Sequence, residues 1–197
     1  MSKKIETIFR EKGGQLRLSD ALREGVSRYQ FYKLRDNGII EMVSRGLYRL
    51  SDLPPVSDPD LMIVGVKYPN AVICLLSALA YYDLTTQIPH AVFIAIPKNS
   101  RRPVLDYPPI QTHRFSSESF QSGIDEVQID GAKIKIYSPE KTLADCFKYR
   151  NKIGMETVLE ALTLYKRRMS FDHKKLLKFG RICRVDKIMK PYLEVHL

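Results

Sequence analysis

The chain has 197 residues, 44% of them hydrophobic and 27% charged, which is the composition of a globular protein with a buried core and excludes a disordered chain. Its longest apolar run, Ala71–Leu76, is too short to span a membrane, and its N-terminus lacks the apolar segment of a signal peptide, so we expect a cytoplasmic protein with no membrane partner. The net charge of +10 lies in two blocks: Lys and Arg outnumber Asp and Glu by 11 to 6 in residues 1–50 and by 13 to 4 in residues 148–190. Such blocks indicate a polyanionic partner, most often nucleic acid.

Two short helices and a strand are predicted before residue 26. Apolar residues spaced three and four apart predict an amphipathic helix over Lys3–Lys12. Leu16–Leu18 is predicted to be extended. Ser19 is the expected N-cap of a second helix, Asp20–Glu24, which Gly25 is expected to end.

The third predicted helix, Arg28–Asn37, has the clearest boundary signals in the chain. Ser27 and Gln30 form the S-x-x-Q pattern of a capping box, and Gly38 is a C-terminal stop signal. Two short helices joined by a turn, the second with basic and aromatic residues near its start, are typical of a helix-turn-helix. The second helix of that motif enters the major groove of DNA.

The exposed arc of this third helix supplies the candidate DNA contacts. Arg28 and Gln30 have the chemistry to bond the edges of guanine and adenine. The other polar side chains suit phosphate contacts. The predicted set on this helix is Ser27, Arg28, Tyr29, Gln30, Tyr32, Lys33 and Arg35. A helical domain with solvated charges and no nucleic-acid ligand is the alternative interpretation.

A β-hairpin is predicted directly after this helix. Ile39–Val43 and Leu47–Leu50 read as strands joined by the turn Ser44–Gly46. A helix-turn-helix followed at once by a hairpin is the order of a winged helix. We expect Arg45 at the tip of the wing, within reach of a minor groove or a phosphate. Arg49 is expected to project from the return strand, either as a further DNA contact or only as a support of the strand.

Three segments together resemble one family. GIIEMVSRGLYRL (Gly38–Leu50) resembles the N-terminal winged helix of the AbiEi antitoxins, which belong to bacterial type IV toxin–antitoxin systems that act in phage defence by abortive infection. AVICLLSALAYYDLTTQIPHAVFIAIPK (Ala71–Lys98) and YSPEKTLADCFKYRNKIG (Tyr137–Gly154) are similar to recognisable segments of that family's C-terminal domain. The resemblance implies a repressor that binds operator DNA, as inverted repeats in its own promoter. It also implies neutralisation of a cognate nucleotidyltransferase toxin without a stable complex.

A linker is predicted between two domains. Ser51–Asp60 carries three prolines and three acidic residues, which is typical of a connecting segment. Residues 1–50 are therefore predicted to bind DNA, and residues 61–197 to form the antitoxin domain. A strand or hairpin pattern recurs up to Tyr137, with a turn at Asp130-Gly131, and helical patterns dominate from Ser138 onward. We expect an α+β fold: an N-terminal winged helix-turn-helix followed by a mixed α/β antitoxin domain with a helical C-terminal part.

The C-terminal helices carry the second basic block. Solvated helix faces explain any single lysine, but thirteen cations in 43 residues favour a functional surface. We expect this surface to act in toxin neutralisation. Its candidate targets are DNA flanking the operator, tRNA and an acidic face of the toxin. The predicted residues are Lys148, Arg150, Lys166, Arg167, Arg168, Lys174, Lys175, Lys178, Arg181 and Arg184.

Motifs for catalysis, metals and cofactors are not found in the sequence. There is no P-loop, no dinucleotide fingerprint and no nucleophile elbow, and the three cysteines are isolated. The four histidines, His90, His113, His173 and His196, lack metal-ligand spacing. The acidic hairpin 125–135 matches a nuclease centre only loosely, because no Asp/Glu-x-Lys triplet lies on a strand. We expect no enzyme activity and no cofactor. A winged-helix regulator whose C-terminal domain senses a ligand or dimerises, with no antitoxin role, remains the alternative.

Overall fold

The computed structural model describes residues 2–195, which form two compact units. The first unit comprises the chain up to Pro69 together with Val127–Ile134, and the second comprises Asn70–Glu126 and the chain from Lys135 onward. Both units combine helices and strands, so the predicted mixed α/β class is confirmed. Within residues 2–195, the helices are all too short or too polar to cross a membrane.

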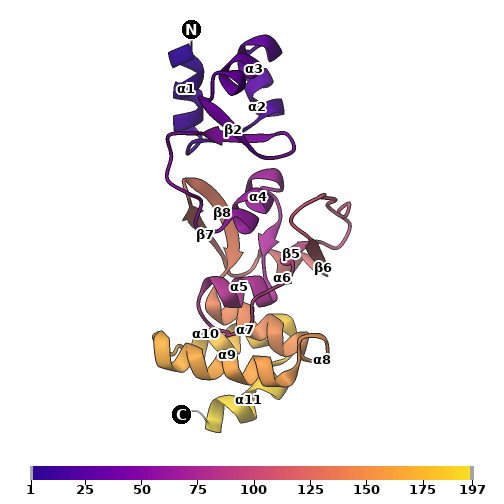
Figure 1. The fold of residues 1–197 in the computed structure, drawn as a ribbon. Coiled ribbons are helices and arrows are strands. Elements are labelled where there is room, and N and C mark those ends of the chain that lie inside the picture. Colours follow the sequence, from indigo (N-terminus) through magenta and orange to yellow (C-terminus); the bar gives the residue numbers. More distant parts are fainter. Residues whose placement is uncertain (1, 196–197) are drawn as a thin grey trace. The chain divides into compact units, whose positions relative to one another are not determined.

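The first unit begins with three helices around a small antiparallel sheet (Figure 1). The elements in chain order are α1 (Ser2–Glu11), β1 (Gln15–Arg17), α2 (Leu18–Arg23), α3 (Arg28–Asp36), β2 (Ile40–Ser44) and β3 (Leu47–Leu50). β3 lies in the middle of the sheet and pairs with both β1 and β2. The predicted hairpin and the third helix are confirmed to within one residue at each end.

The predicted start of the second helix is wrong. α2 begins one residue before Ser19, and its N-cap is Arg17, whose side chain makes no capping hydrogen bond. Arg17 instead donates two hydrogen bonds, of 2.6 and 3.1 Å, to the carboxylate of Asp20 in the first turn. This ion pair stabilises the first turn where a serine cap was expected.

An aromatic cluster holds α3 against the sheet. The ring of Phe31 is fully buried and lies 6.0 Å from that of Phe9 on α1 and 4.9 Å from that of Tyr48 on β3. Leu34, one turn further along α3, is also buried. Because this apolar face of α3 points into the core, its opposite face is left to solvent.

The remainder of the first unit is α4 (Pro59–Lys67) and the tip of the β7–β8 hairpin. Asp130 and Gly131 both have positive φ, 49° and 82°, as a two-residue type I′ turn requires, so the predicted turn is confirmed. Gly13 and Gly131 approach each other so closely that a Cβ on Gly13 would lie 1.9 Å from the carbonyl oxygen of Gly131. Gln15 Nε2 donates to the Asp130 carbonyl oxygen over 2.5 Å.

The segment predicted as a linker is partly ordered by this turn. The backbone amide and the hydroxyl of Ser57 donate to Asp130 Oδ2 over 2.9 and 3.0 Å. Asp58 then caps α4 by accepting from the Leu61 amide at 3.0 Å. Ser51–Asp60 therefore lies inside the first unit and not between the two units. The division of function between residues 1–50 and 61–197 stays a prediction, and residues 196 and 197 lie outside the described range.

A five-stranded mixed sheet, in the order β6-β5-β4-β8-β7, includes the β7–β8 hairpin. β4 pairs antiparallel with β5 and parallel with β8, and β5 pairs parallel with β6. Two-residue β4 and the short helices α6 and α8 were not predicted, because such short elements carry no readable periodicity. The elements are β4 (Val72–Ile73), α5 (Leu75–Tyr81), β5 (Val92–Pro97), β6 (Ile110–Phe115), α6 (Ser117–Gln121), β7 (Ile124–Ile129), β8 (Ala132–Tyr137), α7 (Pro139–Lys148), α8 (Arg150–Ile153), α9 (Met155–Arg168), α10 (His173–Cys183) and α11 (Asp186–Val195).

The C-terminal helices pack around α7, the most buried helix of the second unit (Figure 1). Its predicted start is confirmed: the Ser138 hydroxyl accepts from the Lys141 amide at 3.3 Å, and Pro139 is the first helical residue. One turn along the helix, the fully buried Lys141 ammonium lies 2.5 Å from Asp145 Oδ2. The Cys183 thiol on α10 donates to the other carboxylate oxygen of Asp145 over 3.2 Å.

Candidate nucleic-acid interface

The start of α3 is fixed by the predicted capping box. The Ser27 hydroxyl accepts from the Gln30 amide at 3.3 Å, and the Ser27 amide donates to Gln30 Oε1 over 3.0 Å. Arg28 and Tyr29 thereby stand in the first turn with exposed side chains, that of Tyr29 being 75% exposed. The amide oxygen of Gln30 serves the cap, so this residue has a structural task beside its predicted role at a base edge.

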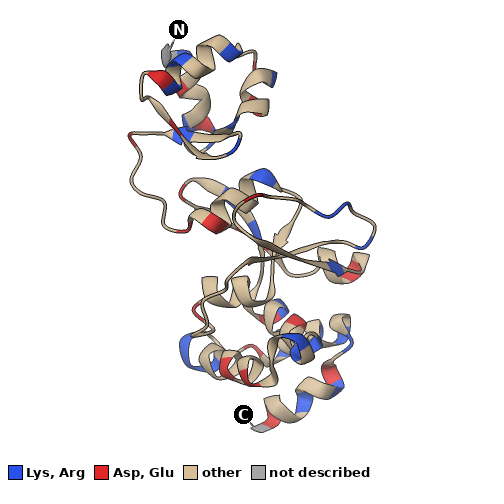
Figure 2. Ribbon diagram, turned by 45° about the vertical axis from the view of Figure 1, so that its right-hand side comes forward, with Lys and Arg blue, Asp and Glu red and all other residues tan. Residues whose placement is uncertain are grey.

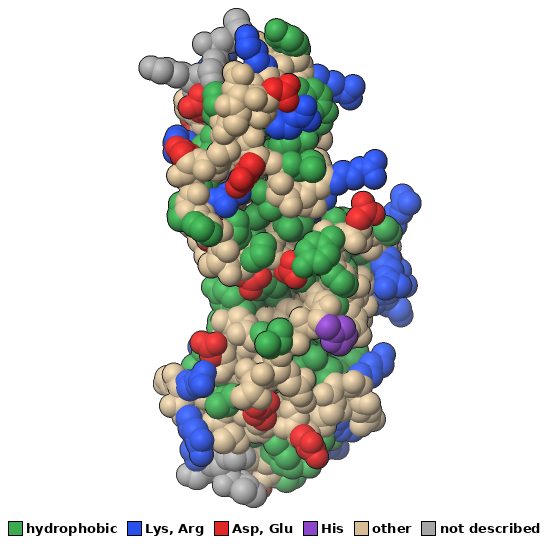
Figure 3. Space-filling model, viewed as in Figure 1, with side chains coloured by type: hydrophobic (Ala, Val, Ile, Leu, Met, Phe, Trp, Pro, Cys, Tyr) green, Lys and Arg blue, Asp and Glu red, His purple; other side chains and the backbone are tan. Residues whose placement is uncertain are grey.

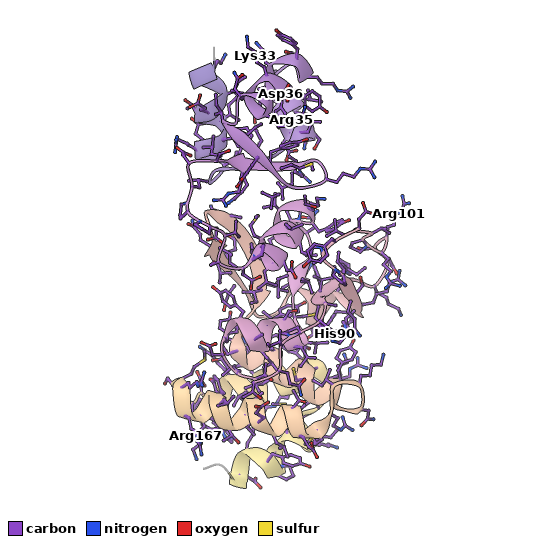
Figure 4. All side chains as sticks on the ribbon, viewed as in Figure 1. Lys33, Arg35, Asp36, His90, Arg101 and Arg167 are labelled. Atoms are coloured by element: carbon purple, nitrogen blue, oxygen red, sulfur yellow. The ribbon has the colours of Figure 1, made fainter. Side chains whose placement is uncertain are left out.

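The outer face of α3 carries further cations. Lys33 and Arg35 are exposed and lie with Asp36 on this helix in Figure 4. The guanidinium of Arg35 pairs with Asp36 over 2.8 Å and stacks over the ring of Tyr32, 4.8 Å from its centroid. The Asp36 carboxylate offsets part of the Arg35 charge, whereas Lys33 presents its ammonium to solvent.

The turn between β2 and β3 brings a second cation to the same region. Arg45 is exposed, and Gly46 closes the turn with a φ of 75°. Arg45 and Arg28 both line one concavity of about 420 Å³, which we call the basic hollow. The residues lining it are Arg17, Leu18, Ser19, Leu22, Arg28, Arg45, Gly46, Lys67 and Tyr68. The start of α3 and the tip of the β2–β3 hairpin therefore share one surface.

Arg49 does not belong to that surface, contrary to its predicted role as a DNA contact. It is only 5% exposed, donates to the Pro54 carbonyl oxygen over 2.5 Å and lies 3.7 Å from Glu41. All four residues of β3 are buried, because this strand is the centre of the sheet. Arg49 supports the fold and is not accessible to a ligand.

A second concavity in the first unit has mixed charge. It measures about 370 Å³ and is lined by Asp20 and Glu24 as well as by cations such as Lys12 and Lys133. Gln15 also lines it, and its buried Oε1 has no hydrogen-bond partner. The carboxylates make this mixed hollow a poorer site for a polyanion than the basic hollow.

The predicted basic surface of the second unit extends over several helices. Nine of its ten residues are exposed, and Arg150 is half-buried. Figure 2 shows the Lys and Arg positions spread over the C-terminal helices with Asp and Glu among them, and Figure 3 shows the same mixture of charges on one face. The basic residues are thus accessible but do not form one uninterrupted stripe.

Several cations of this surface have contacts within the protein. Arg150 donates to the Phe147 carbonyl oxygen and Arg168 to the Asp83 carbonyl oxygen, both over 2.9 Å. Lys175 lies 3.7 Å from Asp172 and 4.0 Å from Glu140. A substitution at any of these three changes the packing of the helices as well as the surface charge.

The hairpin considered as a nuclease centre has a structural role at its turn. The Asp130 carboxylate accepts both hydrogen bonds from Ser57, as described above. No group of three or more metal-ligating side chains lies among residues 2–195. His90 is exposed, His113 is buried, and His196 lies outside the described residues. Cys74, Cys146 and Cys183 are buried free thiols.

Comparisons with known proteins find a similarity in the N-terminal part of the chain. Residues 3–51 match the family described as transcriptional regulator, AbiEi antitoxin. The solved structure of the RV2827C protein from Mycobacterium tuberculosis is similar over 90% of this chain and 70% of that one, with a TM-score of 0.54 and 16% identity, which indicates a shared fold. No curated protein matches the chain.

The family match bears on one of the three resembling segments, Gly38–Leu50. The segments Ala71–Lys98 and Tyr137–Gly154 lie outside the matched residues, so their resemblance stays a prediction. The match includes α1, α2, α3 and the β2–β3 hairpin, which are the elements that carry Arg28 and Arg45. It supports a regulatory role. The predicted resemblance is therefore confirmed for its N-terminal part: residues 3–51 match the family of AbiEi antitoxin transcriptional regulators.

Proposed function

We propose that residues 2–50 form a winged helix that binds operator DNA. In this proposal α3 is the recognition helix and the β2–β3 turn is the tip of the wing. The observation that carries it is the basic hollow, where exposed Arg28 and Arg45 from these two elements line one surface. The capped start of α3 supports it further, because a fixed helix end holds Arg28 and Tyr29 in a defined place.

We further propose that the protein is a type IV antitoxin that represses its own operon and acts in phage defence. It binds inverted repeats in its promoter and neutralises a cognate nucleotidyltransferase toxin without a stable complex. The protein acts in the cytoplasm without catalysis and without a cofactor. The match of residues 3–51 to the AbiEi regulators supports this role, as do the exposed cations of the C-terminal helices.

The DNA-binding part is tested with two single variants of the full-length protein. Arg28→Ala should relax specificity at one base position and weaken the free energy of DNA binding by roughly 1–3 kcal/mol. Arg45→Ala should weaken binding to every sequence alike, because a phosphate contact carries no base information. Titration of both variants against a duplex from upstream of the gene and its single-base variants measures these effects. Wild-type affinity and specificity in both variants would contradict the proposed docking.

The antitoxin part is tested by separating it from repression. Lys174, Lys178 and Arg181 are exposed on α10, whereas Lys175 lies beside Asp172 and Glu140, so its reversal would also disturb the packing. We expect Lys174→Glu/Lys178→Glu/Arg181→Glu to lose toxin neutralisation and to keep operator repression. Arg28→Ala/Arg45→Ala should lose operator repression and keep toxin neutralisation. Growth rescue during toxin expression and a promoter reporter measure the two activities.

A matched triple variant controls for the change in net charge. Lys98, Arg101 and Arg102 are exposed in the loop between β5 and β6, from which Arg101 projects in Figure 4. Lys98→Glu/Arg101→Glu/Arg102→Glu should retain both activities. Equal loss of rescue in both triple variants would show that the basic surface of the C-terminal helices has no specific role in toxin neutralisation. Failure of the wild type to rescue cells from the toxin encoded beside it would favour a regulator with no antitoxin role.

A further inference from the structure

Lys67 lies beside the proposed wing although it belongs to a later element. It is the last residue of α4 and is half-buried. Its ammonium donates to the hydroxyl of Ser44 over 3.1 Å. Ser44 is the last residue of β2 and directly precedes Arg45. This bond therefore fixes a cation from the far side of the Ser51–Asp60 segment at the base of the β2–β3 turn.

The basic hollow collects positive charge from four separate segments of the first unit. Arg17 stands before α2, Arg28 begins α3, Arg45 lies in the β2–β3 turn and Lys67 ends α4. None of its lining residues is an aspartate or a glutamate, in contrast to the mixed hollow. Arg17 pairs with the carboxylate of Asp20 at 2.6 Å.

Cations that share one concavity repel one another, and an anion placed among them relieves that repulsion. The hollow is open to solvent between the two elements proposed to face DNA, so a phosphate of the duplex backbone can enter it. Lysine suits this task as a point charge, and its bond to Ser44 positions the ammonium before the ligand arrives. The negative charge of a polyanionic backbone benefits from all four cations.

We propose that the basic hollow binds one backbone phosphate of duplex DNA and that Lys67 is a DNA contact outside the winged helix. The proposal rests on the proposed DNA-binding function. It extends the DNA-binding surface beyond residues 1–50 to the end of α4. It also explains why Ser51–Asp60 is held inside the first unit: a mobile linker would not keep Lys67 at Ser44.

The test compares Lys67→Gln with Lys67→Arg in the full-length protein. Binding is measured by fluorescence anisotropy over a range of salt concentrations, with a duplex from upstream of the gene and a duplex of unrelated sequence. Lys67→Gln should bind both duplexes roughly fivefold more weakly than wild type. For this variant, the slope of log affinity against log salt concentration should be less negative by about 0.9, because one phosphate contact is lost. Lys67→Arg should keep the wild-type slope.

Two controls separate the charge of Lys67 from its structural contact. Ser44→Ala removes the hydrogen bond and keeps the ammonium, so its salt slope should equal that of the wild type. Lys133→Gln changes the charge equally at an exposed residue of the mixed hollow, and it should bind as the wild type does. A slope in Lys133→Gln as shallow as that of Lys67→Gln would show that the effect does not depend on the basic hollow, and it would overturn the proposal.

The phosphate site and the DNA-binding function can be refuted separately. If Arg28→Ala and Arg45→Ala weaken binding while Lys67→Gln keeps the wild-type slope on both duplexes, the phosphate site is refuted and the proposed function stands. If none of the three variants weakens binding, the proposed function itself is refuted. A loss in Lys67→Gln on the upstream duplex alone would also contradict the proposal, because a phosphate contact acts on every sequence.

Discussion

Arg45 and Arg49, four residues apart on one hairpin, have opposite environments. Arg45 is exposed in the turn, whereas Arg49 is buried and bonded to the Pro54 carbonyl oxygen. The alternation of Leu47–Leu50 predicts which side chains share a face of the strand. It does not predict that the second face is covered as well, because that depends on the path of the chain after Leu50.

The burial of Arg49 predicts a loss of stability without a loss of DNA contact. In Arg49→Ala the Pro54 carbonyl oxygen loses its partner, so the free energy of unfolding should fall by about 1–3 kcal/mol. Chemical denaturation measures this change. Arg45→Ala, at an exposed position, should change stability by less than about 0.5 kcal/mol. Equal stability of the Arg49 variant and the wild type would show that the hydrogen bond from this guanidinium to Pro54 does not stabilise the fold.

His113 predicts a dependence of stability on pH. Burial lowers the pKa of this imidazole below its ordinary value, and the charge of Lys152 lowers it further. Its ring lies 5.7 Å from that of Phe93, and its buried Nε2 has no hydrogen-bond partner. The unfolded chain therefore binds a proton at this residue at a higher pH than the folded chain does. On acidification from about pH 6.5 to 5, the free energy of unfolding should therefore fall by up to about 1.4 kcal/mol per pH unit.

Replacing this imidazole should remove that dependence. The free energy of unfolding of His113→Phe, measured by denaturation at several pH values, should change less over the same range than that of the wild type. His90→Gln, at an exposed histidine, should keep the wild-type dependence. A wild-type slope in His113→Phe would assign the acid sensitivity to other groups.

At the scale of the element, boundaries with a local chemical cause were predicted well. The capping box of α3, the Ser-Pro start of α7 and the Asp130-Gly131 turn all depend on neighbours within a few residues, and all three are confirmed. The start of α2 was missed because the bond between Arg17 and Asp20 replaces a serine cap. β4 was missed because two residues form a strand only when partners from β5 and β8 are present.

The buried ion pair of α7 was not predicted, since lysine and aspartate four residues apart are usual on an exposed helix face. Here the side chains of both are 0% exposed. Burial raises the pKa of the Asp145 carboxyl, while the Lys141 ammonium and the Cys183 thiol oppose that rise. The Lys141 ammonium lies over the rings of Phe115 on β6 and Tyr137 on β8, 5.0 and 4.1 Å from their centroids.

Removing one partner should therefore be costly. Lys141→Met leaves the carboxylate of Asp145 buried without its cation, and we expect a loss of about 3–5 kcal/mol in the free energy of unfolding. Lys141→Met/Asp145→Leu should recover a large part of it. Lys190→Met breaks an exposed pair of the same spacing, with Glu194 at 3.8 Å, and should cost less than about 1 kcal/mol. Equal losses in the two single variants, measured by chemical denaturation, would contradict the account of the buried pair.

At the scale of the whole molecule, the two basic blocks of the sequence fall into different units. The first block includes the exposed cations of α3 and the β2–β3 turn, and the second covers the C-terminal helices. The predicted boundary at Ser51–Asp60 followed from composition alone. The structure includes that segment in the first unit, where Ser57 bonds to Asp130 at the turn of the β7–β8 hairpin.

Contacts between residues far apart in sequence also explain what was missed at the candidate site. Arg28 and Arg45 were predicted from their neighbours in the helix and the hairpin. Lys67 gave no such signal, because its place beside Ser44 depends on a contact across 23 residues of chain. The sequence thus predicted the elements of the proposed interface, but not the residue that α4 adds to it.

The central claim is that the first unit recognises DNA upstream of its own gene through α3 and the β2–β3 turn. Footprinting of the full-length protein on that DNA tests it most directly, with Arg28→Ala/Arg45→Ala as the comparison. We predict a protected pair of inverted repeats for the wild type and no protection for the variant at the same concentration. Absence of protection by the wild type, or equal protection by the variant, would contradict the account.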